Sequence, residues 1–430
     1  MNRQKLNIKN NVALRIDQTD KFKMSRLSIA FIYDADKVES SKKMLTFSTL
    51  MRGSKNYPTV TKINCALDDL YGSTVLYRYS SDGDRHTFTF ICEMLEQKYI
   101  PSDDRMDIIG GTLKILSDIL FNPLFDSDGK FISEYVDSEK AIAIDNIRAK
   151  INDQRAYASS KCKKLLYDGA PCGISVDGDE ETVSSFDRTS LVECYKSIFS
   201  SARVECGYIG SENADTISRL LNEFFAQMPE SLNECSYGYT AFQSDKDLLY
   251  AEEIRNVTQG RLSIGMSCGV VLGDKDYYAM SVFNEIFGGA STSKLFMNVR
   301  EKKSLCYYCN SVYHLSKGAI FVSCGVNPDN KDEAYNEIMH QLDMMKNGEI
   351  TADEIKTAKK MICGSLRQVT DSTSGIDGYA FRRAMAGLDE STMDTIEKIN
   401  AVSYDDIVRV ARLVEPKVVY FLRGEEEADG

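Results

Sequence analysis

Arg300 and Tyr307 are the two residues of this chain whose types and spacing most clearly suggest chemistry. They lie seven residues apart in the segment FGGASTSKLFMNVREKKSLCYY, residues 287–308. Arginine is a planar donor with a permanent charge, and tyrosine is a neutral hydroxyl donor. Both side chains can therefore donate hydrogen bonds to an oxygen that gains negative charge. These groups are suited to holding a peptide carbonyl, and we expect the groups that break the bond to lie elsewhere.

A junction between a helix and a strand must position this pair. Apolar residues at helical spacing predict a helix over residues 277–287, and the residues around Tyr307 read as a strand. Gly288 and Gly289 follow the helix, and glycine often ends helices because it tolerates the left-handed cap. The two glycines therefore predict a tight helix exit and, more weakly, a loop that contacts substrate.

The chain repeats one plan twice. Arg-Leu-Ser-Ile opens an apolar strand at residues 26–29 and again at residues 261–264, and each strand is followed by a loop and an amphipathic helix. The ends of the two halves also match, because residues 190–210 and 405–424 both read as a helix followed by a strand. The same order of elements over such lengths indicates a duplicated domain.

The predicted fold class is α+β, with two homologous domains that each contain an antiparallel-rich sheet with helices packed on one face. The expected N-terminal domain spans residues 1–227, and the expected C-terminal domain spans residues 241–430 and carries the Arg/Tyr pair. The polar residues 228–240 are the expected linker. Within the first domain, residues 132–157 read as one long helix.

Composition narrows the function classes. The 430 residues include 52 basic and 64 acidic side chains, for a net charge of −12. This balance argues against nucleic acid, whose binders present a basic surface. We expect no membrane span and no signal peptide, because no apolar run reaches about 18 residues and the N-terminus is polar. Twelve scattered cysteines indicate reduced thiols and a cytoplasmic location.

Cys306 and Cys309 form a C-x-x-C pattern on the predicted strand. Such a pair can indicate redox or metal chemistry. Residues three apart on a regular strand face opposite sides, so we expect the two sulfurs to diverge. The pattern then indicates two separately packed thiols.

Residues 287–308, the duplicated halves and the Arg52-Gly53-Ser54 turn after the first helix together resemble the insulinase/pitrilysin-type metallopeptidases, the inverzincins. The resemblance covers nearly the whole chain. The length is similar to that of a branch whose members have two homologous domains and pair as two chains. Within it, the chain most resembles bacterial subunits that lack the zinc motif.

The resemblance also identifies what is missing. Active inverzincins carry His-x-x-Glu-His on the first helix and a third ligand, a glutamate, on a later helix. Alignment on the first-helix glycine places these positions at Met44, Phe47 and Ser48, and the later glutamate at Asn146. None of the four suits zinc or general-base chemistry. All three histidines of the chain lie at or after residue 86, so no shift of register restores the motif.

Arg300 and Tyr307, by contrast, match the family's Arg/Tyr pair. The resemblance therefore implies a non-catalytic subunit that closes the chamber of a heterodimeric zinc peptidase. It would supply this pair in trans to a peptide substrate held by a homologous, zinc-bearing partner, and would be inactive alone. No cofactor is expected in this chain, and zinc is expected in the partner. Two alternatives stay open: a purely structural or peptide-binding scaffold, and, less favoured, a self-sufficient hydrolase with another site.

Overall fold

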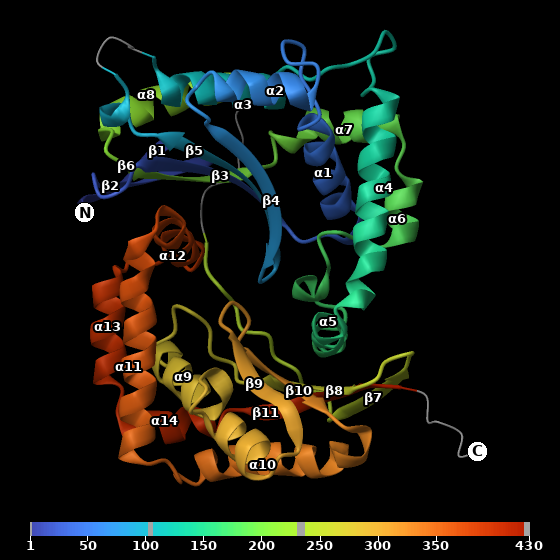
Figure 1. The fold of residues 1–430 in the computed structure, drawn as a ribbon, viewed down its shortest axis with the longest axis vertical. Helices are drawn as coiled ribbons and strands as arrows, with labels where there is room; N and C mark the ends of the chain where they lie inside the picture. The colour runs from blue at the N-terminus through green and yellow to red at the C-terminus, as the bar shows by residue number, and fades with distance from the viewer. Residues whose placement is uncertain (1, 102–105, 230–236, 425–430) are drawn as a thin grey trace. The chain divides into compact units, whose positions relative to one another are not determined.

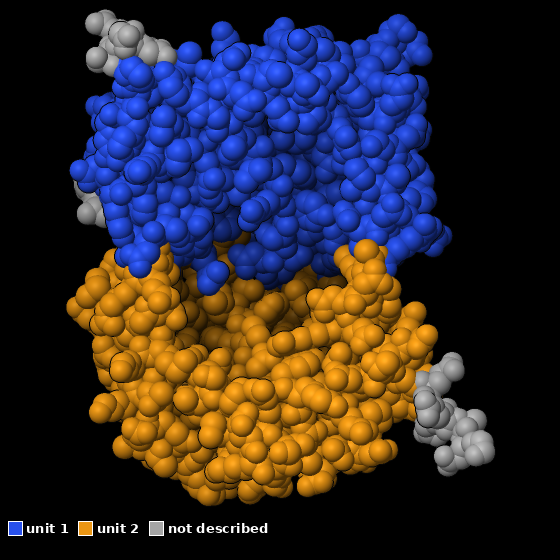
Figure 2. All heavy atoms as spheres, in the orientation of Figure 1, with its two compact units in different colours: residues 1–148, 174–236, 370–382 blue, residues 149–173, 237–369, 383–430 orange. Residues whose placement is uncertain are grey.

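A computed structural model describes residues 2–101, 106–229 and 237–424 of the chain. It contains two compact units, which Figure 2 colours separately. Unit 1 comprises Met1–Arg148, Ile174–Ser236 and Thr370–Arg382. Unit 2 comprises Ala149–Gly173, Tyr237–Val369 and Arg383–Gly430.

Unit 1 is built on a six-stranded sheet in the order β1-β2-β6-β3-β5-β4. Only β2 and β6 pair in parallel. The strands are β1 (Asn2–Lys9), β2 (Val12–Gln18), β3 (Met24–Asp34), β4 (Thr74–Asp82), β5 (Arg85–Leu95) and β6 (Arg203–Gly210). The helices that lie wholly or mainly in this unit are α1 (Lys37–Leu50), α2 (Val60–Asp68), α3 (Ile108–Phe121), α4 (Ser133–Ala149), α6 (Glu180–Ser185), α7 (Arg188–Ile198), α8 (Ala214–Phe225) and α12 (Thr373–Met385).

Unit 2 is built on a five-stranded sheet in the order β7-β11-β8-β10-β9. Its strands are β7 (Leu249–Ile254), β8 (Gly260–Ser267), β9 (Cys306–His314), β10 (Ala319–Val326) and β11 (Glu415–Arg423). Its helices are α5 (Gln154–Leu166), α9 (Tyr277–Asn284), α10 (Lys331–Lys346), α11 (Ala352–Gln368), α13 (Thr392–Ala401) and α14 (Tyr404–Ala411), with π-helical segments η4 (Glu285–Gly289) and η5 (Leu295–Lys302). Within the described ranges, no helix combines the length and apolar character needed to cross a bilayer.

The two sheets share one topology, which confirms the α+β fold with two homologous halves. In each sheet a parallel pair, β2 with β6 or β7 with β11, is followed by three antiparallel neighbours. The repeated Arg-Leu-Ser-Ile sequence lies in β3 in one sheet and in β8 in the other, at equivalent places in the strand order. Among the strands of residues 2–101, 106–229 and 237–424, β1 has no counterpart in the second sheet.

The predicted single helix over residues 132–157 is wrong. It is two helices, α4 and α5, separated by a 3-10 turn at Lys150–Asn152. Asp153 begins α5, because its carboxylate accepts a hydrogen bond from the backbone N–H of Ala156 at 2.9 Å. Helices α11 and α12 repeat this arrangement. In both segments, a 17-residue helix is followed by a 3-residue 3-10 turn and a 13-residue helix.

These breaks let the second helix of each pair join the other unit. Helix α5 belongs to unit 2, and residues 373–382 of α12 belong to unit 1. The division expected from the repeat, 1–227 and 241–430, therefore differs from the compact units by these exchanged segments, and it stays a prediction about the duplicated sequence. Within the expected linker, residues 230–236 lie outside the described part of the chain.

Alternation along β3 explains how unit 1 buries both faces of its sheet. Leu27, Ile29 and Phe31 point into the main apolar core, beneath helices that include α3 and α8. Arg26 and Ser28 point to the opposite face, where α12 covers them (Figure 1). The sheet therefore has one apolar face and one polar face, and both are buried.

The polar face is held by an ionic cluster. Asp377 of α12 accepts hydrogen bonds from Arg26 Nε at 3.1 Å and from Ser28 Oγ at 2.9 Å, and it lies 4.0 Å from Arg15. Arg15 in turn lies 3.3 Å from Glu205, whose pKa is raised because its burial outweighs the attraction of that arginine. These five side chains are all buried. Unit 2 differs, because α5 packs on its sheet through apolar side chains.

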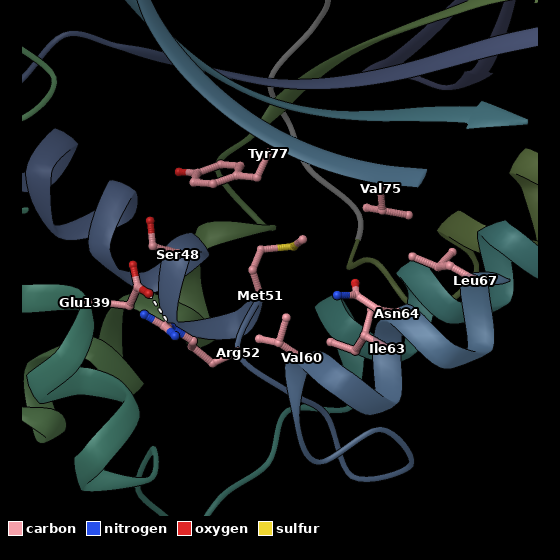
Figure 3. A pocket seen from close by; sticks show the side chains of 10 residues that line it. All are labelled: Ser48, Met51, Arg52, Val60, Ile63, Asn64, Leu67, Val75, Tyr77 and Glu139. Carbon is pink, nitrogen blue, oxygen red and sulfur yellow. Dashed lines mark hydrogen bonds and ion pairs between the residues drawn. The ribbon is translucent and has the colours of Figure 1, made fainter. Parts of the chain in front are cut away.

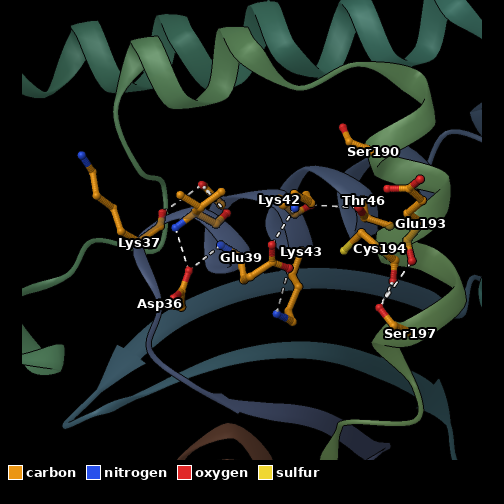
Figure 4. A network of polar contacts seen from close by, with 12 residues as sticks. Asp36, Lys37, Glu39, Lys42, Lys43, Thr46, Ser190, Glu193, Cys194 and Ser197 are labelled. Carbon is orange, nitrogen blue, oxygen red and sulfur yellow. Dashed lines mark hydrogen bonds and ion pairs between the residues drawn. The ribbon is translucent and has the colours of Figure 1, made fainter.

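Helix α1 is positioned by a polar network at its first turn (Figure 4). The Asp36 carboxylate accepts the backbone N–H groups of Val38 at 2.9 Å and Glu39 at 2.7 Å. Glu39 in turn pairs with Lys42 at 2.6 Å. The hydrogen bond from Glu39 is the main cause that lowers the pKa of Asp36. This cap sets where α1 begins and therefore how its side chains face the sheet.

We expect Asp36→Ala to lower the free energy of unfolding by about 1 kcal/mol at pH 7, because two helix N–H groups lose their acceptor. Asp36→Asn retains an acceptor and should lower the free energy of unfolding by only about a few tenths of a kcal/mol. Since the folded-state pKa is lowered, the contribution is present above the unfolded pKa of about 3.9 and is lost as pH falls through the folded-state value. Urea unfolding of the three proteins between pH 7 and pH 3 measures both effects. Equal stability of the alanine variant at pH 7 would contradict the capping role.

Candidate functional site

Arg300 is carried by the π-helical segment η5, which ion pairs hold at both ends. At its start, the buried Lys294 lies 2.9 Å from Glu354 of α11. At its end, Lys303 lies 2.7 Å from Glu337 of α10. The pairing with Lys303 contributes to lowering the pKa of Glu337 against the effect of burial. Irregular as it is, the segment that carries Arg300 is therefore firmly tied to unit 2.

The side chain of Arg300 is partly exposed and is oriented by its neighbours. Its guanidinium carbon lies 4.6 Å from the ring centre of Phe296, and its Nε lies 3.6 Å from Glu301. The ring supports one face of the planar cation, whereas the exposed ion pair contributes little energy. The guanidinium therefore retains N–H donors that face solvent and can bind an acceptor.

Tyr307 is presented by a β-bulge. In the pairing of β9 with β10, Tyr308 lies opposite Gly325 and Cys306 lies opposite Val326, so Tyr307 is the extra residue. Tyr307 is 61% exposed. Among the described residues, its hydroxyl forms no hydrogen bond and its ring makes no aromatic contact. Bulges often redirect a side chain next to functional sites. Here the bulge directs the phenol into solvent.

The neighbouring Tyr308 is instead held by contacts within unit 2. Arg155 of α5 lies 4.2 Å from its ring centre. The ring also packs on Gly325, where a Cβ atom would lie 2.4 Å from the tyrosine Cε1. Of the two adjacent tyrosines, Tyr307 is therefore the one available to a ligand.

Irregular backbone concentrates between these two residues. Two π-helical segments precede the strand, and Ser304 adopts a φ of 52°, which is unusual for a residue other than glycine. Such features recur at functional sites, where the surrounding structure maintains them. The positive charge of Arg300 also acts on the thiol of Cys306, the residue before Tyr307. The structure thus places the Arg/Tyr pair in one neighbourhood of unit 2.

Gly288 and Gly289 have different surroundings. Gly288 is buried against β9, and a Cβ atom there would lie 2.6 Å from the backbone nitrogen of Ser311. Close packing of η4 on the strand accounts for this glycine. Gly289 is exposed, and a Cβ atom there would meet the Glu285 carboxylate at 2.7 Å. Substrate contact by the two glycines stays a prediction.

The four positions matched to the zinc motif fill other roles in unit 1. Met44 is buried, Ser48 is partly buried, and Asn146 is exposed on α4. Phe47 is fully buried at the centre of an aromatic cluster. Its ring centre lies 5.4–6.2 Å from those of Phe31, Tyr77, Phe88, Phe90 and Phe199.

Zinc does not fit this set. A thioether and a phenyl ring replace the first imidazole and the general base, and the phenyl ring is part of the core. Among residues 2–101, 106–229 and 237–424, no group of three or more histidine, cysteine or acidic side chains is arranged to hold a metal ion. A glutamate at position 47 would place a charged carboxylate among five aromatic rings, where burying an unpaired charge is strongly unfavourable.

A pocket of about 310 Å³ lies beside these positions (Figure 3). Ser48, Arg52 and Glu139 provide polar groups on its wall, and the rest is mainly apolar. Arg52 Nε donates a hydrogen bond to the Glu139 carboxylate, so the acid is already paired. Desolvation raises the pKa of Tyr77 on the opposite wall, which keeps this phenol neutral. With its acid already paired to Arg52, the pocket is poorly suited to hold a metal ion.

Sequence reasoning missed two features. Glu139 lies seven residues before Asn146 on α4, two helical turns away, so helical spacing could have identified it as a neighbour of the motif position. The expectation that Cys306 and Cys309 diverge is wrong, because the extra residue at Tyr307 returns both sulfurs to one face. Only the pairing with β10 reveals this bulge.

Comparisons with known proteins agree with the loss of the zinc motif. Residues 185–362 match the family described as "Peptidase M16 inactive domain". The chain is 29% identical over 413 residues to "Probable inactive metalloprotease YmfF" of Bacillus subtilis (strain 168), and the match covers 96% of each chain. It is 24% identical over 304 residues to "Uncharacterized zinc protease YmxG" of the same organism, covering 70% of this chain and 71% of that protein.

Solved structures share the fold. A conserved protein from Enterococcus faecalis V583 superposes with a TM-score of 0.90 at 24% identity, and the match covers 100% of both chains. A peptidase M16 inactive domain from Pseudomonas fluorescens superposes with a TM-score of 0.79 at 16% identity, also over 100% of both chains. At these identities the likeness concerns the fold alone.

Proposed function

We propose, from the premise that this chain is an inactive-type member of the peptidase M16 family, that it is the non-catalytic subunit of a two-chain zinc peptidase. Its partner is a homologous chain with an intact zinc motif. This chain closes the partner's chamber and presents Arg300 and Tyr307 to the peptide bound there. Alone, it neither binds zinc at the motif positions nor cleaves peptides.

The contrast between the two halves of the site carries the proposal. At two of the motif positions, Met44 and Phe47 are buried in the apolar core, and Phe47 lies among aromatic rings. By contrast, Tyr307 is exposed and Arg300 partly exposed, and both follow irregular backbone. The bulge at Tyr307 interrupts the hydrogen bonds between β9 and β10, which a regular strand pair would retain. A ligand for the exposed phenol would explain why this irregularity is present.

The chemistry of the pair fits the holding of a carbonyl during peptide hydrolysis. Arg300 can donate two parallel N–H groups to acceptor oxygens and so orient the substrate. Tyr307 can donate its O–H to the oxygen that gains negative charge as the carbonyl carbon becomes tetrahedral. Neither side chain activates water, so the pair assists catalysis only beside another chain's metal and base.

Co-purification with a homologous chain that carries an intact His-x-x-Glu-His, followed by zinc and cleavage measurements, tests the proposal. We expect a stable complex, with zinc bound only by the partner. Cleavage of a quenched peptide should require both chains, because each supplies half of the groups. The two isolated chains are the controls.

Other outcomes would contradict the proposal in distinct ways. One equivalent of zinc in this chain alone would contradict the loss of the motif. Chelator-resistant cleavage by the pure chain would favour a self-sufficient hydrolase. A stable complex in which the partner is equally active with and without this chain would favour a purely structural scaffold.

A further inference from the structure

Three cysteines gather on one face of the β9–β10 pair. Cys309 lies directly opposite Cys324 in the register, so their side chains share a face. Val326 is two residues beyond Cys324 and therefore on the same face. Cys306 lies opposite Val326, because the bulge at Tyr307 shifts the register by one residue. Without the bulge, the Cys306 side chain would point to the other side.

The three thiols differ in their access to solvent. Cys309 is 2% exposed and Cys324 is 0% exposed, whereas Cys306 is only partly buried at the edge of the core. Strand β9 is also the edge strand of its sheet. A reagent in solution therefore reaches Cys306 first, and the two buried thiols lie behind it.

The surroundings of Cys306 favour its thiolate. Hydrogen bonds from Cys309 and then Cys324, together with the charge of Arg300, lower the pKa of the Cys306 thiol well below its usual range, whereas burial opposes this change. Those interactions and burial raise the pKa of Cys309, which keeps it a neutral S–H donor. These pKa shifts favour a thiolate at the accessible Cys306 and protonated thiols at Cys309 and Cys324.

We propose that Cys306, Cys309 and Cys324 form an oxidation site, in which Cys306 reacts with a hydroperoxide and a buried neighbour converts the product to a disulfide. Reactive sensor cysteines share this arrangement of an accessible thiolate beside a resolving thiol. The site is separate from the proposed peptidase role, and the isolated chain suffices to test it.

Both steps balance with the hydroperoxide as the oxidant. The Cys306 sulfur attacks the outer peroxide oxygen, so an S–O bond forms and the O–O bond breaks. The sulfur loses two electrons and becomes a sulfenic acid. The remaining oxygen fragment of the peroxide takes up a proton and leaves as an alcohol, or as water when the oxidant is hydrogen peroxide. The thiol of Cys309 or Cys324 then attacks the Cys306 sulfur and releases water as the S–S bond forms.

Competitive alkylation provides the first test, with Cys65 as the matched control. Cys65 is exposed on α2, so access alone favours it. At pH 6 an ordinary thiol with a pKa of about 8.5 is only about 0.3% thiolate. The lower nucleophilicity of a low-pKa thiolate offsets part of the advantage of Cys306. We expect iodoacetamide to label Cys306 roughly tenfold faster than Cys65 at pH 6, as measured by peptide mass spectrometry. Faster labelling of Cys65 would overturn the proposal.

Oxidation with hydrogen peroxide provides the second test. We expect the reduced protein to lose two hydrogens and to form a disulfide between Cys306 and Cys309 or Cys324, seen by non-reducing peptide mapping. Cys306→Ser should abolish this product. In the Cys309→Ala/Cys324→Ala double variant, dimedone should trap the sulfenic acid on Cys306. A disulfide that excludes Cys306, or no disulfide with intact Cys306 after peroxide treatment, would overturn the proposal. Because the alkylation test uses the unmodified chain, it stands even where the double variant fails to fold.

Discussion

Tyr307→Phe, assayed in complex with the zinc-bearing partner, is expected to lower kcat by about 10²–10³, which corresponds to about 2.7–4 kcal/mol. The substitution removes one hydroxyl that we assign to the developing oxyanion. Because that charge arises only in the transition state, the loss should fall on kcat while KM changes little. The side chain is 61% exposed, so the folded chain should be unaffected. Steady-state cleavage of a quenched peptide measures both constants.

Tyr250→Phe is the matched control for this experiment. Tyr250 is also 61% exposed but lies on β7, at the other edge of the same sheet. Its loss should change kcat less than twofold, since a single exposed hydroxyl away from the site contributes little. Equal kcat values for Tyr307→Phe and the unmodified complex would remove the role assigned to Tyr307. A loss confined to KM would assign it to ground-state binding instead.

Asp377→Ala is expected to lower the free energy of unfolding by about 3 kcal/mol, because it leaves buried arginines short of their counter-ion. Arg26 and Ser28 would both lose a hydrogen-bond acceptor. Arg26 would still pair with Glu93 at 2.7 Å, and Arg15 with Glu205. These remaining pairs keep the expected loss of unfolding free energy at the lower end of the usual range. Urea unfolding measures the loss, and amide exchange should show less protection in residues 370–382.

Asp371→Ala is the control, because it removes a carboxylate from the same exchanged segment. Asp371 pairs with Lys21 at 2.9 Å, but its side chain is 69% exposed. Exposed pairs contribute about 0–1 kcal/mol, so this variant should remain near the unmodified stability. Similar costs for the two substitutions would show that the segment depends on general packing and not on the buried ion cluster. Unchanged protection of residues 370–382 in Asp377→Ala would contradict the anchoring role.

Much of the fold could be predicted because its signals are local. The alternation of apolar residues in β3 and the repeat of Arg-Leu-Ser-Ile in β8 both lie within single strands. The capping box at Thr351 likewise predicts the start of α11 from four residues. The pocket beside Ser48 could not be predicted in this way, because its wall combines α1, α2, α4 and β4.

The sequence by itself determined that the zinc motif is missing and that the chain repeats one plan, since both follow from residue identities and short-range spacing. It also identified Arg300 and Tyr307 as candidates. Only the tertiary structure decided that α5 and α12 exchange between the units and that Tyr307 is the exposed tyrosine. The physical reason is that strand register and helix docking depend on partners far along the chain. The convergence of Cys306 with Cys309 and Cys324 follows from that register and from no local pattern.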